Sequence, residues 1–325
     1  MMPLNIFKSR IFGIFLAFLL LCLFIGFAEY LIKPAPVFFK PANWMNILLQ
    51  VSINAIMAVG MTFIIITSGI DLSVGSLLAL CNVVLGLVMV QFSPEAGFMQ
   101  LTLGIFATLA TGGIIGFMNG GISVQWRIPP FIVTLGTLGV ARGLALWLID
   151  SQTENLIGRV TPSFSFIGNG TVAGIPFPAL VAIFIMLIGH IILNYTVFGR
   201  HITAIGSNED AARLCGIQVK SNKIWVYIIG GVLVAVAAVI QTSRLGSANP
   251  TIGQGFELYA IAAVIIGGTN LMGGEGSIVG TLVGALIIGV LNNGLTLMNI
   301  PDEIKQIIIG LVIIVAVLID QMRKR

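Results

Sequence analysis

The sequence predicts an all-α protein that crosses a membrane about ten times. Of its 325 residues 57% are apolar and 9% are charged, whereas a soluble domain carries about a quarter charged residues. The mean hydropathy is +1.07, and uncharged stretches recur at the length of about 20 residues that a helix needs to cross a bilayer. Too few ionisable side chains remain to cover a water-facing surface, so a soluble globular protein is excluded.

Division of these stretches at prolines, charges and glycine clusters predicts ten crossings within a single transmembrane domain, residues 1–325. Their approximate ranges are 11–31, 44–67, 72–92, 98–122, 129–149, 178–196, 224–243, 257–271, 277–298 and 304–320. The apolar run after Lys8 and Arg10 is longer than the core of a secretory signal, and no small-x-small cleavage site follows it. The first crossing is therefore predicted to stay uncleaved.

The basic residues predict the orientation. With the N-terminus in the cytoplasm, ten of the 16 Lys and Arg lie inside, five lie outside and Arg142 lies within a span, as the positive-inside rule favours. Both termini are then cytoplasmic, with Arg323, Lys324 and Arg325 inside. The net charge of +4 does not indicate a nucleic-acid partner, because the basic residues form short clusters between apolar runs rather than one stripe.

Two stretches outside the membrane are long enough to fold. Residues 150–177, rich in proline and glycine, would face outward, and residues 197–223 would face the cytoplasm. In the cytoplasmic stretch, Ser207 is predicted to cap a short helix with acids in its first turn, and Gly216 is predicted to end it.

This cytoplasmic helix would carry a small apolar face. Ala211, Leu214 and Cys215 share one side at i, i+3, i+4 spacing, and charged residues flank them. Such a helix suits a cleft in another protein. The alternative is an ordinary capped connector between two spans.

Several glycines repeat at four-residue spacing within spans, which lets helix backbones approach closely. They are Gly112, Gly116 and Gly120, then Gly276, Gly280 and Gly284. The segments GIDLSVGS from Gly69 and GGEGSIVG from Gly273 each place an acid two residues before a serine at a predicted cytoplasmic junction. The similarity of these two segments is consistent with a duplicated helix-turn-helix.

Catalytic and nucleotide-binding motifs are absent from the sequence. No Gly-x-x-x-x-Gly-Lys-Ser/Thr loop occurs, so any ATP would be used by a partner. Cys22, Cys81 and Cys215 have no paired spacing, and His190 and His201 have no ligand set beside them, so neither a metal nor another bound cofactor is expected.

Few charges fall within the predicted spans. Asp71, Glu257 and Glu275 lie near span ends, and Arg142 is predicted to reach outward toward Asp150 or Glu154. No ladder of intramembrane acids or bases of the kind used by proton-coupled carriers is present.

Three stretches resemble the membrane-spanning permease subunits of bacterial ABC importers for monosaccharides, the ribose permease group in particular. They are NAIMAVGMTFIIITSGIDLSVGSLLAL (54–80), FGRHITAIGSNEDAARLCGI (198–217) and FELYAIAAVIIGGTNLMGGEGSIVGTLVGALIIGVLNNGL (256–295). The resemblance covers essentially the whole chain. Tyr259 stands where the family commonly has Asp, and Ser207 and Cys215 also depart from the usual loop, so the exact sugar stays open among ribose, allose, xylose, galactose, inositol and a signalling furanosyl compound.

The resemblance implies a non-enzymatic sugar permease with the ABC importer permease fold. It implies a homodimer in the bacterial inner membrane, two copies of a cytoplasmic ABC ATPase, and a periplasmic or lipid-anchored sugar-binding protein. The loop 197–223 would dock on the ATPase through a coupling helix that involves Gly206, Asn208, Glu209, Ala211, Ala212 and Gly216. The other motif residues are Gly69, Asp71, Ser73, Gly75, Glu257, Gly267, Gly268 and Gly274.

Two rival classes compete with this interpretation. A proton-coupled or facilitative carrier would need neither ATPase nor binding protein. A membrane enzyme would need a cluster of catalytic polar residues at one membrane face, and the sequence offers none.

A sugar path should offer scattered neutral hydrogen-bonding groups that hold the substrate weakly. The candidates within spans are Asn54, Thr62, Thr134, Thr137, Asn292 and Asn293. The alternative for each is a hydrogen bond that joins two helices.

Overall fold

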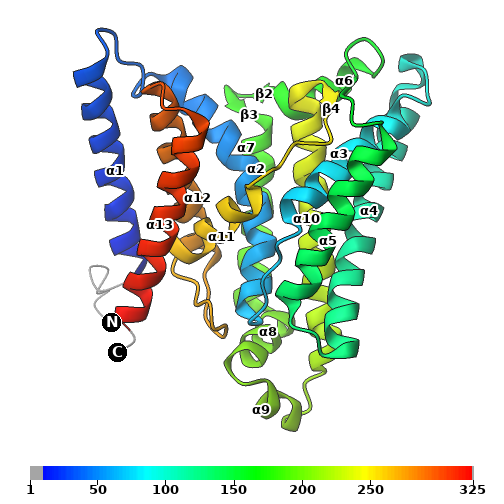
Figure 1. The fold of residues 1–325 in the computed structure, drawn as a ribbon, viewed down its shortest axis with the longest axis vertical. Coiled ribbons are helices and arrows are strands. Elements are labelled where there is room, and N and C mark those ends of the chain that lie inside the picture. Colours follow the sequence, from blue (N-terminus) through cyan, green and yellow to red (C-terminus); the bar gives the residue numbers. More distant parts are fainter. Residues whose placement is uncertain (1–9, 324–325) are drawn as a thin grey trace.

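The computed structural model describes residues 10–323, which are almost entirely helical (Figure 1). The helices are α1 (Arg10–Ile32), α2 (Pro41–Ile66), α3 (Val74–Met89), the 3-10 turn η2 (Pro94–Ala96), α4 (Gly97–Trp126), α5 (Pro130–Leu148), α6 (Pro162–Asn169), α7 (Phe177–Tyr195), α8 (Val197–Ser207), α9 (Glu209–Leu214), α10 (Val219–Leu245), α11 (Phe256–Ile266), α12 (Ile278–Leu297) and α13 (Asp302–Arg323). The predicted all-α polytopic class is confirmed. Lys8, Lys324 and Arg325, which helped to predict the orientation, lie outside the described residues.

Strands are minimal in this part of the chain. Strand β1 (Glu154–Asn155) pairs antiparallel with β4 (Ser247–Ala248), and β2 (Thr171–Val172) pairs antiparallel with β3 (Ile175–Pro176). All four strands and α6 lie toward one end of the molecule, and α8 and α9 form the other end, together with the start of α1 and the end of α13 (Figure 1).

The ten predicted crossings correspond to ten helices, but they differ in length. Within residues 10–323, seven helices are long and apolar enough to cross a membrane: α1, α2, α4, α5, α7, α10 and α12. Helices α3 and α11 have 16 and 11 residues, which at about 1.5 Å per residue span only about 24 and 17 Å. The predicted ranges 72–92 and 257–271 therefore hold short helices preceded by non-helical chain, and α11 lies midway between the two ends (Figure 1).

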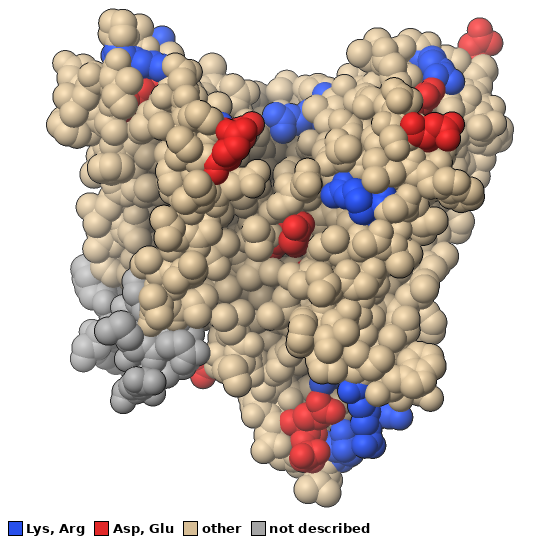
Figure 2. Space-filling model, viewed as in Figure 1, with Lys and Arg blue, Asp and Glu red and all other residues tan. Residues whose placement is uncertain are grey.

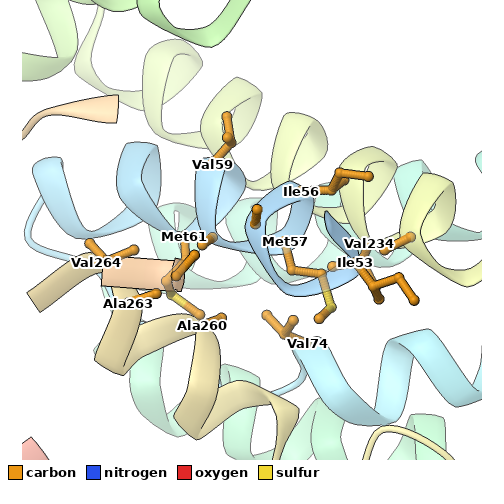
Figure 3. Close-up of a cluster of buried hydrophobic side chains, with 14 of the residues drawn as sticks. Ile53, Ile56, Met57, Val59, Met61, Val74, Val234, Ala260, Ala263 and Val264 are labelled. Carbon is orange, nitrogen blue, oxygen red and sulfur yellow. The ribbon is translucent and has the colours of Figure 1, made fainter. Parts of the chain in front are cut away.

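Helix α2 is the centre of the bundle. In its most apolar window 83% of the residues are buried, compared with 22% in α5, so α2 is surrounded by protein while α5 is peripheral. Figure 3 shows side chains of α2, including Ile53, Met57 and Met61, beside Val74 of α3, Val234 of α10 and Ala260 of α11.

The periphery carries large exposed apolar side chains, as a surface in contact with lipid requires. Phe24 of α1, Phe106 of α4 and Trp147 of α5 are 67%, 69% and 73% exposed. In the view of Figure 2, charged side chains gather mainly toward the two ends of the molecule.

The glycine repeats pack helices against one another. A Cβ at Gly112 or Gly116 would overlap a backbone carbonyl of α10, and one at Gly280 or Gly284 would overlap the backbone at or just after α11. Only glycine permits these two close helix approaches.

Candidate functional site

The loop 197–223 contains two short helices, and its capping differs from the prediction. The side chain of Asn208 caps α9, because its Oδ1 accepts a hydrogen bond from the Ala211 amide at 2.9 Å. Ser207, the predicted cap, is instead the last residue of α8, and its hydroxyl donates to the Thr203 carbonyl at 2.9 Å. The prediction failed because both residue types can cap, and the end of α8 decides which one is free to do so.

Helix α9 has an inner and an outer face. Ala212 is 4% exposed and packs with Ile205 and Val219. The opposite face, formed by Ala211, Leu214 and Cys215, is exposed, with Leu214 at 89%. We call these three residues the outer α9 face. Helix α9 lies at the tip of the molecule (Figure 1).

Two basic residues hold Glu209 at the start of α9. Its carboxylate accepts a hydrogen bond from Arg213 at 3.0 Å and another from Lys223 of α10. Burial opposes ionisation, but the Lys223 ammonium and the Arg213 guanidinium outweigh it and hold the pKa of Glu209 below its ordinary value. These contacts fix α9 to the beginning of α10.

Gly206 connects this loop to the rest of the bundle. A Cβ at Gly206 would overlap the carbonyl of Ile66, the last residue of α2, and that same carbonyl accepts a hydrogen bond from the Gly274 amide at 2.9 Å. The Ser68 hydroxyl donates to the Met272 carbonyl at 2.8 Å. The loop 197–223, the end of α2 and the turn before α12 therefore form one continuous junction.

The remaining motif glycines either adopt φ values that favour glycine or allow close contacts. Gly274 and Gly268 adopt φ values of 79° and 85°, which favour glycine. Gly267 lies against the backbone of Gly280, and Gly69 lies against the Tyr227 hydroxyl.

The non-helical segment 67–73, between α2 and α3, is bound to α4 and α5. Asp71 accepts hydrogen bonds from Ser73, and Asn119 of α4 donates to the Ser73 hydroxyl at 3.1 Å. The Thr134 hydroxyl accepts from the Leu72 amide at 3.1 Å and lies 3.2 Å from the Ile70 carbonyl, to which it can donate. These partners satisfy backbone groups that would otherwise lack hydrogen bonds inside a membrane.

The beginnings of α3 and α11 meet. A Cβ at Gly75 would overlap both the Gly253 carbonyl and the carboxylate of Glu257. A Cβ at Gly253 would in turn overlap the Gly75 carbonyl. Gly75 therefore allows the segment before α11 and the Glu257 side chain to lie over the first turn of α3.

Arg142 lies beside this contact between α3 and α11 and, within the described residues, pairs with neither of its predicted partners, Asp150 and Glu154. Its Nη1 donates to the carbonyls of Pro250 and Ile252, at 2.6 and 2.9 Å. Glu154, one expected partner, pairs with Arg159 instead. Arg142 and Glu257 line a cavity of about 400 Å³ together with Ser76, Thr251 and Gln254. The sequence hides this site because its residues come from α3, α5 and the segment 249–257.

The six candidate path residues fall into two groups. Three of them hydrogen-bond to other helices: Thr62 to Thr281 at 2.8 Å, Asn293 to Asn43 at 3.0 Å, and Thr137 to Asn119 at 2.6 Å. A fourth, Thr134, hydrogen-bonds to the segment 67–73 as described.

The other two, Asn54 and Asn292, line a cavity of about 180 Å³ between α2, α10, α11 and α12. Its remaining polar lining residues are Gln50, Gln241, Arg244 and Tyr259. We call it the amide-lined cavity. The i, i+4 spacing of Gln50 and Asn54 places both amides on one face of α2, and this feature of the cavity could be recognised from the sequence.

Comparison with known proteins assigns most of the chain to one family. Residues 43–317 match the family described as branched-chain amino acid transport system / permease component. The chain is 43% identical over 287 residues to the ribose import permease protein RbsC of Bacillus subtilis, covering 88% of this chain and 87% of the relative.

Two further relatives are named for other sugars. The chain is 37% identical to the D-allose transport system permease protein AlsC of Escherichia coli, covering 88% of this chain and 85% of the relative. It is also 37% identical to the fructose import permease protein FrcC of Rhizobium meliloti, covering 87% of this chain and 79% of the relative. No solved structure shows significant similarity to the chain.

Proposed function

The chain belongs to the family of branched-chain amino acid transport system permease components, and from this premise we propose that it is the membrane-spanning subunit of an ATP-driven importer for ribose or a related monosaccharide. It is a transport permease and not an enzyme. The observation that carries the proposal is its match, over most of its length, to a protein named for ribose import. The family description mentions amino acids, but the individual relatives are named for sugars, which favours a monosaccharide.

Reconstituted transport tests this function. Liposomes that contain the permease with its ABC ATPase and its sugar-binding protein should accumulate labelled D-ribose, D-allose or D-fructose only when ATP is supplied. The chain alone should accumulate none. Accumulation by the chain alone under a proton gradient would support a secondary carrier, and uptake of leucine instead of any sugar would overturn the sugar assignment.

The importer needs a contact that transmits ATP hydrolysis to the membrane domain. We assign this contact to the outer α9 face, supported by its exposure and by the rigid junction through Gly206 to the end of α2. Asn208, Glu209 and Gly216 hold α9 in place at its two ends, and Ala212 packs it inward. A bulky substitution at Ala212 or Gly206 would disturb this internal packing rather than the docking surface itself.

A substitution on the outer α9 face tests docking more directly. Leu214→Asp places a charge on a side chain that is 89% exposed, so the permease should fold and insert normally while sugar uptake and binding of the ATPase are lost. Leu214→Met keeps an apolar contact and serves as the matched control. Normal uptake in Leu214→Asp would remove α9 from the docking contact.

The proposed complex contains a second copy of the chain, with both termini and α9 in the cytoplasm. Arg142 and Glu257 support the second copy, because both are only half-buried at the level of membrane-crossing helices, where a charge facing lipid is costly. A disulfide between copies of Leu135→Cys on α5 should form in membranes, whereas Phe106→Cys on α4 should not cross-link. The reverse result would place the interface elsewhere.

A further inference from the structure

The amide-lined cavity contains polar groups that the protein itself does not satisfy. Gln241 is 8% exposed, and its buried Oε1 has no hydrogen-bond partner. The buried Oδ1 of Asn54 is likewise unpartnered. Arg244 forms no ion pair within residues 10–323. Buried polar atoms in native proteins nearly always have partners, so this set indicates a ligand that supplies hydrogen bonds.

The chemistry of the lining suits a ligand with many hydroxyl groups. Side-chain amides both donate and accept, so Gln50, Asn54, Gln241 and Asn292 can each pair with a hydroxyl group in either role. Among the residues that the structure describes, no carboxylate lines the cavity to attract a cation. Arg244, one helical turn after Gln241, adds a group that can only donate hydrogen bonds.

One wall of the cavity is aromatic. Phe256 and Tyr259 occupy the first turn of α11, with ring centroids 5.9 Å apart and planes inclined by 37°. A monosaccharide carries C–H groups on its ring faces and hydroxyl groups around its edge, so it can place a face on these rings and its edge against the amides. Pockets commonly combine an aromatic wall with a few polar groups in this way.

The size of the cavity restricts the ligand. Its volume of about 180 Å³ equals about six waters at about 30 Å³ each. That space suits one small solute. A disaccharide would extend out of the cavity.

We infer that the amide-lined cavity is a transient binding site for the monosaccharide on its way through the permease. This inference rests on the proposed function and adds a site to it. The sugar leaves the binding protein, exchanges its hydrogen bonds for those of Asn54, Gln241, Arg244 and Asn292, and is held weakly, as a conduit requires. The first turn of α11 then separates this sugar from the charged cavity of Arg142 and Glu257, because Phe256 and Tyr259 face one cavity and Glu257 the other.

Protection from a thiol reagent tests the site. Asn292→Cys in the purified full-length permease should react with a water-soluble maleimide, and millimolar D-ribose, D-allose or D-fructose should slow that reaction. Sucrose at the same concentration should have no effect. Cys215, which is exposed on α9, is resolved by peptide mass as an internal control whose labelling no sugar should change.

Two outcomes would overturn the inference. One is a rate of labelling at the introduced thiol of Asn292→Cys that no sugar changes. The other is no labelling of that thiol in the absence of sugar, because the cavity would then be closed to solvent. Either result, together with ATP-driven uptake in the complete system, refutes the site and leaves the proposed function intact. Absence of sugar uptake in the complete system refutes the function.

A pair of glutamine substitutions separates a binding role from a structural one. In the Asn292→Cys background, Gln241→Met removes an unpartnered carbonyl, so the melting temperature should stay equal or rise while protection needs about tenfold more sugar. Gln100 is the matched control, because it is also buried but hydrogen-bonds to the Met89 carbonyl and the Thr161 amide, at 2.9 and 2.8 Å. Gln100→Met should lower the melting temperature and leave protection unchanged. A lower melting temperature with unchanged protection in Gln241→Met would show that Gln241 is structural.

Discussion

The Oδ1 atom of Asp71 accepts two hydrogen bonds from Ser73, one from the amide at 2.8 Å and one from the hydroxyl at 2.6 Å. Asp71 is 3% exposed, so these donors replace water around its carboxylate. Since Ser73 immediately precedes α3, the contact fixes the place where the non-helical segment becomes a helix. The relationship explains the acid and the serine two residues apart in the GIDLSVGS motif.

Substitution of Asp71 should separate hydrogen bonding from charge. Asp71→Asn keeps an oxygen acceptor for the Ser73 amide, so partial uptake is expected. Asp71→Leu leaves the amide and the hydroxyl without this acceptor, at a cost of about 1–3 kcal/mol, and uptake should be lost. Sugar uptake normalised to the amount of folded permease measures both. Equal behaviour of the two variants would refute the hydrogen-bonding role.

The Thr62 and Thr281 hydroxyls, 2.8 Å apart and both fully buried, should act as a structural pair. Thr62→Val strands the Thr281 hydroxyl and should lower the free energy of unfolding by about 1–3 kcal/mol. Thr281→Val should cost less, because the Thr62 hydroxyl still donates to the Ala58 carbonyl at 2.7 Å. The double variant should cost less than the sum of the two. Unfolding in detergent measures this cycle. If the two losses of unfolding free energy are additive and the folded double variant transports sugar poorly, the result would instead favour a role in the sugar path.

Arg142 should anchor the segment before α11. Arg142→Lys retains a cationic donor for the carbonyls of Pro250 and Ile252 and should keep part of the uptake. Arg142→Met leaves both carbonyls unsatisfied, so uptake should fall about tenfold or more. Hydrogen exchange at residues 249–255 should also become faster in Arg142→Met. Unchanged exchange in that variant would show that the segment is held by other contacts.

The ion pairs of Glu209 should make the order of α9 depend on pH in one direction. Because the folded protein holds the pKa of Glu209 below its ordinary value, its stabilising contribution is complete above that ordinary value and is lost as the pH falls through the lower, folded value. Hydrogen exchange in 208–215, corrected for its intrinsic pH dependence, should therefore stay slow from pH 7 to about pH 5 and increase below about pH 4.

Glu209→Gln is the control for this pH dependence. It should increase exchange in α9 at pH 7 and remove the acid step. An acid step of the same size in Glu209→Gln would assign the effect to another group. Lys223→Met should act in the same direction, because it removes one of the two cations that stabilise the carboxylate.

The capping of the α8–α9 loop shows which local features can be predicted from the sequence alone. The sequence correctly predicted a short helix with acids in its first turn that stops before Gly216. It named Ser207 instead of Asn208 as the cap, because neighbouring residues with similar capping ability differ only in where the preceding helix ends. The apolar outer α9 face needed no tertiary information, since i, i+3, i+4 spacing fixes it.

The sequence alone determined the class and the helical segments of this protein, because partition into a bilayer depends on the composition of about 20 consecutive residues. It did not determine the exact ends of α3 and α11, which are flanked by segments rich in glycine, serine and threonine. That outcome depends on Thr134 and Arg142 of α5, which hydrogen-bond to non-helical backbone, and on Asn119 of α4, which donates to the Ser73 hydroxyl. Likewise, only packing decided that Thr62 meets Thr281 while Asn54 and Gln241 remain without partners. Composition sets how deeply a helix lies in the membrane, but the rotation and contacts of neighbouring helices decide which polar groups meet.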